Sequence, residues 1–219
     1  FATGFVLISF IGTRTIVLLT GVILVLMALL VTRLGRSTAQ AAIVLLLLLA
    51  LGNQIVQRDA LASPCTLETD YFCIKISEQA AEGSRPAMKR LVLDHLVHSF
   101  VALDDPTHLE YGYEKVYAEM ARYLAGDRRG LKALFIGGGG YTFPRYLEAI
   151  YPGSALDVVE IDPAVTRVAY SHLGLPAAST IRSYNEDARQ YLMRARPSGD
   201  YDLILGDAFN DLSVPYHLT

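Results

Sequence analysis

Four consecutive glycines, residues 137–140, constrain the fold of this chain more than any other feature of its sequence. They end the apolar run LKALFIG (131–137), and the residues that follow, 143–151, have the pattern of a helix. A strand that turns into a helix through glycines leaves bare backbone, which a ligand can approach closely. A tight turn without a ligand is the alternative that the glycines alone leave open.

Two common nucleotide-binding fingerprints fail at this loop. The dinucleotide pattern G-x-G-x-x-G needs a third glycine where this chain has Thr142, and the Walker pattern needs a lysine, which the sequence lacks from 133 to 219. Hydride transfer and phosphate chemistry are therefore disfavoured. Residues 61–219 also carry more acids than bases, which argues against nucleic acid as a partner.

The chain around the loop alternates between strand and helix patterns. Strands are predicted at 131–137, 155–162, 180–184 and 201–207, with helices between them at 143–151, 163–174 and 186–195. Before this region, a β-hairpin is predicted from 68–76 and 88–96, and a helix from 110–126, which Gly126 ends. The alternation predicts an α/β fold with a Rossmann-like, doubly wound parallel sheet.

Carboxylates follow three of the predicted strands. Glu160, Asp187 and Asp207 come at or just after the second, third and fourth strands. In a parallel sheet these ends share one edge, so the three side chains are expected to meet beside the glycine loop. A carboxylate there can accept the hydroxyls of a ribose, and another can accept an adenine amine. Each acid alone also fits a helix cap or a solvated loop. Together they indicate a pocket for S-adenosylmethionine or a derivative.

The first 52 residues are expected to lie in a membrane. The run 15–32 has eighteen residues without a charge, close to the ~20 that cross a bilayer core, and 1–12 and 38–52 are shorter apolar runs. The expected division is transmembrane helices at 1–52, a linker and hairpin at 53–108, and the adenosyl-binding sheet at 109–219. The sequence begins inside an apolar run and stops before the last strands of such a sheet, so we expect a sheet truncated at the C-terminus.

The location that follows is a multi-pass protein of the cell inner membrane. Arg33 and Arg36 outnumber Arg14, which places the loop 33–37 in the cytoplasm. If 38–52 then crosses fully, the following domain lies outside, where a Cys65–Cys73 disulfide is plausible. The need for a sulfonium donor favours the cytoplasmic side instead. The sequence leaves both sides open.

The ordered segments YEKVYAEM, LFIGGGGYTFPRYL, VVEID, NEDARQYL and YDLILGDAF resemble the spermidine synthase (polyamine aminopropyltransferase) family, in particular its membrane-fused branch. The resemblance implies a sheet of the S-adenosylmethionine-dependent methyltransferase type. It also implies transfer of an aminopropyl group from decarboxylated S-adenosylmethionine, or use of S-adenosylmethionine itself, with a small amine as acceptor. No metal is implied. The implied partners are the amine and membrane lipid, with a homodimer as the assembly.

The resemblance also assigns roles to individual residues. Glu160 is implied to hold the ribose, Asp187 with the adjacent Ala188 to bind adenine, and Asp207 to be the catalytic acid. Tyr117 is implied to line the amine pocket. The backbone of Gly137, Gly138, Gly139 and Gly140 is implied to face the donor.

The chain departs from the family pattern in the amine half of the site. Where the family has G-G-G-D-G, this chain has Gly140 in place of the acid, and Phe72 and Ala118 replace expected polar side chains. Two alternatives therefore stay open: a methyltransferase with the same adenosyl pocket, and a non-catalytic membrane protein that binds an adenosyl ligand or a polyamine. Pro215 predicts a shaped loop that closes over the site.

Overall fold

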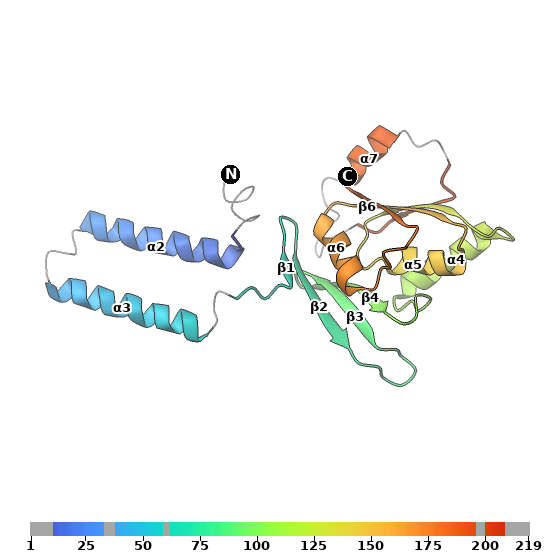
Figure 1. The fold of residues 1–219 in the computed structure, drawn as a ribbon. Helices are drawn as coiled ribbons and strands as arrows, with labels where there is room; N and C mark the ends of the chain where they lie inside the picture. Colours follow the sequence, from blue (N-terminus) through green and yellow to red (C-terminus); the bar gives the residue numbers. More distant parts are fainter. Residues whose placement is uncertain (1–10, 33–37, 59–61, 196–199, 209–219) are drawn as a thin grey trace. The chain divides into compact units, whose positions relative to one another are not determined.

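The computed structural model describes residues 11–32, 38–58, 62–195 and 200–208. These residues belong to two compact units, Phe1–Asp70 and Tyr71–Thr219 (Figure 1). Both cysteines of the chain are disulfide-bonded, so neither is a free thiol. The predicted three-part division at residues 53 and 109 stays a prediction.

The first unit contains two helices, α2 (Thr13–Thr32) and α3 (Thr38–Gln57), and the short strand β1 (Leu67–Glu68). Among the described residues, no helix combines the length and the apolar character that a membrane crossing requires.

The predicted transmembrane helices at 15–32 and 38–52, and the multi-pass membrane location derived from them, are therefore wrong. The predicted apolar segment 1–12 lies largely outside the described residues. The α/β part of the fold prediction does not depend on these segments.

The second unit begins with an antiparallel arrangement of β2 (Cys73–Gln79), β3 (Met88–Leu93) and β4 (Leu96–Ala102). β2 pairs with β3, which confirms the predicted hairpin. The second predicted strand, 88–96, is broken by a turn in which Asp94 has a φ of 58°, a conformation that Asp tolerates better than most residues. Strand β4 therefore folds back on β3, and the sequence analysis missed it.

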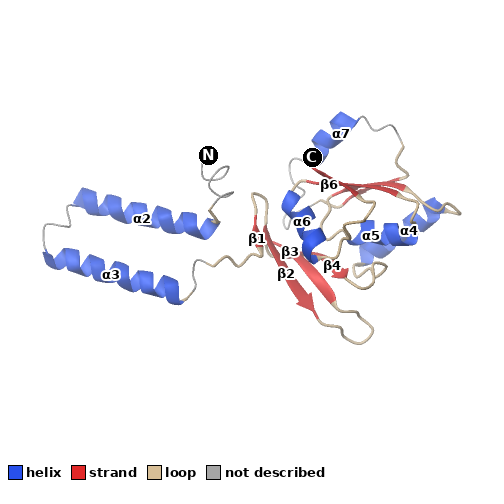
Figure 2. Ribbon diagram, in the orientation of Figure 1, coloured by secondary structure: helices blue, strands red, loops and turns tan. Residues whose placement is uncertain are grey.

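The rest of the second unit is the predicted parallel sheet. Its strands are β5 (Lys132–Ile136), β6 (Ala155–Glu160), β7 (Arg182–Asn185) and β8 (Leu203–Gly206), in the order β7-β6-β5-β8. All neighbouring pairs are parallel. Helices precede and connect the strands: α4 (Gly112–Ala125), α5 (Thr142–Ile150), α6 (Pro163–His172) and α7 (Ala188–Ala195). Figure 2 shows this alternation of red strands and blue helices, which confirms the Rossmann-like prediction.

Alternate residues of the strands face opposite sides of the sheet. Ala133 and Phe135 of β5 belong to one hydrophobic cluster, together with Leu147 of α5. Leu134, between them in sequence, packs instead in a cluster with Tyr191 of α7. Because a strand points successive side chains to opposite faces, this division shows helices covering both faces of the sheet.

The ends of two helices follow their sequence signals. Asp162 caps α6, with its Oδ1 accepting a hydrogen bond from the backbone N–H of Ala164 at 2.8 Å, and Pro163 occupies the first turn. Gly126 ends α4 with a φ of 53°. On α4, Val116 is 59% exposed while Ala121 is buried.

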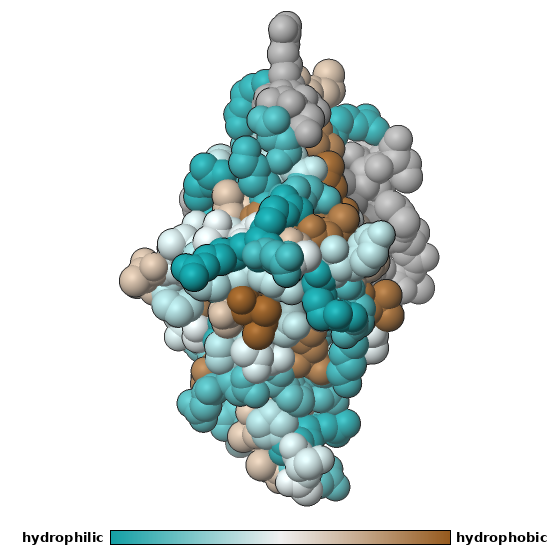
Figure 3. All heavy atoms as spheres, turned by 90° about the vertical axis from the view of Figure 1, so that its right-hand side faces the viewer, coloured by the Kyte–Doolittle hydropathy of each residue, from teal (hydrophilic) through white to brown (hydrophobic). Residues whose placement is uncertain are grey.

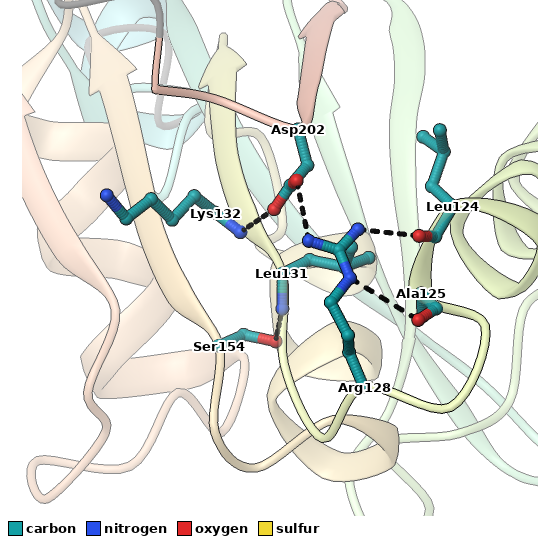
Figure 4. A network of polar contacts seen from close by, with 7 residues as sticks. All are labelled: Leu124, Ala125, Arg128, Leu131, Lys132, Ser154 and Asp202. Carbon is teal, nitrogen blue, oxygen red and sulfur yellow. Dashed lines mark hydrogen bonds and ion pairs between the residues drawn. The ribbon is translucent and has the colours of Figure 1, made fainter.

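A network of polar contacts holds the amino end of the parallel sheet (Figure 4). Arg128 lies 2.8 Å from the Asp202 carboxylate, and it also donates to the carbonyls of Leu124 and Ala125 at the end of α4. The other oxygen of Asp202 accepts from the backbone N–H of Lys132 at 2.8 Å. The network therefore joins the ends of α4, β5 and β8 through one carboxylate.

The face of the protein in Figure 3 carries hydrophilic residues over most of its area. Hydrophobic residues appear between them in smaller groups. Folded proteins commonly leave such apolar atoms on their surface.

Candidate active site

The carboxyl ends of the four parallel strands bring the predicted site residues to one edge of the sheet. Gly137 follows β5 directly, Glu160 ends β6, and Asp207 follows β8 directly. The backbone N–H of Asp207 donates to the carbonyl of Ile136 at 2.8 Å, which extends the β5–β8 pairing to this point. The sheet thus places the glycine loop between the two acids.

Gly137 has a backbone conformation and surroundings that exclude other residues. Its φ is 101°, and a Cβ atom added there would lie 2.4 Å from the carbonyl oxygen of Asp207. L-residues rarely adopt this φ, and no Cβ tolerates so short a contact with backbone. Glycine at this position therefore lets the loop after β5 pass directly against the residue after β8.

Glu160 is buried beside the loop. One of its carboxylate oxygens accepts from the backbone N–H of Gly138 at 2.8 Å, and the other accepts from the N–H of Asp162 at 2.9 Å. Burial raises the pKa of Glu160, and these two hydrogen bonds oppose that rise. The carboxylate therefore fixes the shape of the loop, and its predicted role toward a ribose stays a prediction.

A cavity of about 310 Å³ opens at this edge of the sheet. Five residues predicted for the site line it: Tyr117, Gly137, Gly138, Gly139 and Asp207. The cavity is in the size range of small-molecule sites. The structure thus unites the predicted catalytic pair with most of the glycine loop.

Asp207 is the acid of this cavity that sequence reasoning identified. The phenolic O–H of Tyr113 donates to its Oδ2 at 3.1 Å. Burial raises the pKa of Asp207, while the Tyr113 hydrogen bond and the nearby His98 lower it. A partly desolvated carboxylate of this kind binds cations and accepts protons more readily than a solvated one.

Asp187 and Ala188 do not line this cavity. Asp187 lies at the start of α7, where its Oδ1 accepts from the backbone N–H of Gln190 at 3.0 Å. Ala188 is buried, and it packs in the same hydrophobic cluster as Leu134 and Tyr191. Both residues follow β7 at the same edge of the sheet, but their predicted contact with adenine stays a prediction.

Gly140 also lies outside the cavity lining, and its surroundings explain why no acid occupies the position. Its N–H donates to Ser99 Oγ at 2.8 Å. An added Cβ would lie 2.6 Å from Ser99 Cβ and 2.8 Å from Val101 Cγ2, both on β4. With β4 in this place, an aspartate at 140 does not fit without rearrangement.

The structure adds three residues that sequence reasoning did not assign to the site. Tyr113, Glu114 and His98 all line the cavity. Glu114 is only 5% exposed, although it lies in the first turn of a helix. The sequence did contain a signal for Glu114. It lies three residues before Tyr117, and this spacing places both side chains on one face of α4. His98 gave no signal, because β4 was not predicted.

Two further predictions concern other features of the site. The predicted lid at Pro215 lies outside the described residues. In the part of the chain that the structure describes, no group of three or more His, Cys, Asp or Glu residues is arranged to hold a metal ion.

Comparisons with known proteins point in one direction. No family model matches the sequence. The chain is 42% identical over 88 residues to a polyamine aminopropyltransferase of Vibrio vulnificus, a match that covers 40% of this chain and 29% of that protein. It is 31% identical over 124 residues to a polyamine aminopropyltransferase of Chromobacterium violaceum, covering 56% of this chain and 46% of that protein. The matched regions thus span less than half of either relative.

A solved structure supports the fold. The crystal structure of a probable spermidine synthase from Corynebacterium glutamicum matches 68% of this chain and 53% of its own, with a TM-score of 0.58 and 24% identity. These matches do not show the membrane-fused branch. The sequence relatives support the resemblance to the spermidine synthase (polyamine aminopropyltransferase) family over the regions that they match.

Proposed function

We propose that this chain belongs to an enzyme that transfers an aminopropyl group from decarboxylated S-adenosylmethionine to a small amine. The observation that supports this most directly is the cavity in which Asp207 and Tyr117 meet the glycine loop. The two sequence relatives named polyamine aminopropyltransferase provide independent support. The catalytic part would comprise the hairpin region 53–108 and the sheet region 109–219.

The proposed donor site uses the glycine loop and the acids beside it. The backbone of Gly137, Gly138, Gly139 and Gly140 would pass close to the nucleoside, and Glu160 would accept its ribose hydroxyls. Asp187 and Ala188 would bind the adenine from the end of β7. Support for this arrangement comes from the shared carboxyl edge of the four strands.

The proposed chemistry is a displacement at the carbon next to the sulfonium. The acceptor amine carries a proton at neutral pH, because its pKa resembles that of lysine, about 10.4. Asp207 would bind this cation and take up its proton, which frees the nitrogen electron pair that forms the new C–N bond. The C–S bond breaks with its electron pair going to sulfur, and methylthioadenosine leaves as a neutral thioether. Tyr117 would orient the amine, and alignment of nitrogen, carbon and sulfur would supply most of the acceleration.

Methyl transfer from intact S-adenosylmethionine is the second candidate. The observation that favours it is Gly140, which leaves no carboxylate to recognise the amine of an aminopropyl donor. The crowding of this position by Ser99 and Val101 supports the same reading. The two reactions differ in which group reaches the acceptor, so product masses distinguish them.

A homodimer is the assembly we propose. Helix α4 exposes a group of large apolar or aromatic side chains: Val116, Met120, Tyr123 and Leu124. Such a group on one helix is typical of an interaction surface. Sedimentation velocity on the full chain would show a dimer, and a monomer at all concentrations would contradict the proposal.

Asp207→Asn tests the proposed activity. Incubation of the protein with each donor and a panel of amines, with products identified by mass spectrometry, gives the wild-type reaction. We expect an aminopropylated amine, a rate roughly 10²- to 10⁴-fold lower for Asp207→Asn, and unchanged donor affinity. A methylated product would favour the second candidate. Binding of a donor without any product would argue for a non-catalytic protein.

A further inference from the structure

Glu114 is a buried carboxylate that lines the same cavity as Asp207. It lies in the first turn of α4, is 5% exposed, and comes from a different element than Asp207, which follows β8. Among the described residues, the ion pairs with lysine or arginine include neither carboxylate. Within the described part of the chain, the two acids of this cavity are therefore not ion-paired with an arginine or a lysine.

Tyrosine rings form much of the wall around these acids. Tyr111, Tyr113 and Tyr117 all line the cavity. The rings of Tyr111 and Tyr113 stack with centroids 5.4 Å apart, and Tyr113 meets Tyr117 edge-on, also at 5.4 Å. Aromatic faces attract organic cations, and they offer an alkyl chain an apolar surface. This combination suits an alkylammonium ion.

We propose that Glu114 is a second carboxylate of the acceptor-amine pocket and binds the protonated amine together with Asp207. The inference rests on the proposed transferase function, since it names the group that recognises the acceptor. When Asp207 receives the proton of the reacting amine, its own charge is neutralised. Glu114 then keeps the pocket anionic, so a second ammonium group on the acceptor, or the new ammonium of the product, remains paired.

The electrostatics of the pocket agree with this assignment. Burial raises the pKa of Glu114 to about 7, the Tyr111 hydrogen bond and Lys115 oppose the rise, and the charges of Asp207 and Glu110 add to it. His98 of β4 also lines the cavity. A bound cation favours the charged form of Glu114, so amine binding at pH 7 is expected to release part of a proton.

Glu114 also has a structural role that must be separated from binding. Its Oε2 accepts a hydrogen bond from the backbone N–H of Tyr111 at 3.2 Å, which completes the start of α4. Glu114→Gln keeps an oxygen that can accept this bond but removes the charge. The helix start and the cation site therefore respond differently to this one substitution.

Glu119→Gln is the matched control on the same helix. Its side chain is 69% exposed and pairs with Arg122, also exposed, at 2.7 Å. Glu119 does not line the cavity. The control thus removes one negative charge from α4 without changing the pocket.

The experiment is calorimetric titration of the full chain with 1,4-diaminobutane at pH 7, in two buffers of different ionisation enthalpy. The wild type and Glu119→Gln are expected to bind with equal affinity and to release protons, seen as a buffer-dependent enthalpy. Glu114→Gln is expected to bind at least tenfold more weakly and to lose most of the buffer dependence. Thermal unfolding of each variant shows whether α4 remains intact.

The outcomes separate this inference from the proposed function. Equal affinity of Glu114→Gln and the wild type would overturn the assignment, as would wild-type binding without proton release. Binding that depends on Glu114 without any turnover would support the pocket and count against the transferase. Aminopropyl transfer with an unchanged KM for the amine in Glu114→Gln would support the transferase and overturn the role of Glu114.

Discussion

The aspartates that flank strand β8 lie in different environments, which shift their pKa values in opposite directions. Asp202, just before the strand, accepts from the Lys132 backbone and pairs with Arg128, and these contacts lower its pKa. Asp207, just after the strand, is partly buried beside Tyr113, and this burial raises its pKa. The four residues of β8 thus separate a carboxylate with an arginine partner from one that lines a cavity.

This difference divides the sheet into an edge that stabilises and an edge that binds. At the amino edge, a basic side chain compensates the acid and ties α4 to β5 and β8. At the carboxyl edge, Asp207 and Glu114 face one cavity. Neither forms an ion pair with lysine or arginine among the described residues, so a cationic ligand would supply that partner. Perturbed carboxylates in a cleft are typical of functional sites. The following predictions test this division, beginning with the largest expected effect.

Gly137→Ala is expected to damage the carboxyl edge most. The added Cβ would meet the Asp207 carbonyl at 2.4 Å, at a φ of 101°. Strain and crowding together predict a loss of about 3 kcal/mol or more in the free energy of unfolding. Gly206→Ala is the control, because a Cβ there meets nothing within 4 Å. Urea unfolding checks both, and equal stability of the two variants would contradict the close approach of the loop to β8.

The two aspartates of β8 are expected to respond to amidation with opposite signs. Asp202→Asn weakens a charge-assisted contact, so the free energy of unfolding at pH 7 should fall by about 1–2 kcal/mol. Asp207→Asn removes a partly buried charge that burial disfavours, so the free energy of unfolding at pH 7 should stay the same or rise.

The pH dependence follows from the same shifts. Because its folded pKa is lowered, Asp202 contributes stability above its unfolded pKa, and this is lost as pH falls through the folded value. The raised pKa of Asp207 makes its charged form costly, so that stability declines as pH rises from its unfolded pKa to its folded pKa. Urea unfolding measured from pH 3 to 8 would show both trends. If Asp202→Asn and Asp207→Asn both lowered the free energy of unfolding at pH 7, the proposed difference between the two edges of the sheet would be contradicted.

Tyr113→Phe should have the smallest effect. The hydrogen bond from Tyr113 stabilises the Asp207 carboxylate at 3.1 Å, so its removal should raise the pKa of Asp207 further. A net hydrogen bond of about 1 kcal/mol corresponds to a shift of roughly 0.7 pH units. The acidic limb of the pH–rate profile should therefore move to higher pH. A limb that stays in place would show that Asp207 is not the group that titrates there.

Much of the sheet was predictable from local pattern. The alternation of apolar strands and helices, the cap Asp162–Pro163 and the stop at Gly126 depend on neighbouring residues, and all three agree with the structure. The prediction of transmembrane helices was wrong, since no helix among the described residues combines the length and the apolar character of a membrane span.

The sequence by itself determined the parallel sheet, its glycine loop and the acids at its carboxyl edge, because backbone preferences and side-chain periodicity act over a few residues. Only the tertiary structure decided which groups share the cavity. It brought His98 from β4 and Glu114 from α4 to Asp207, and it left Asp187 and Gly140 outside the lining. Which side chains line the cavity together depends on how elements that are distant in the chain pack, and no local pattern specifies this packing.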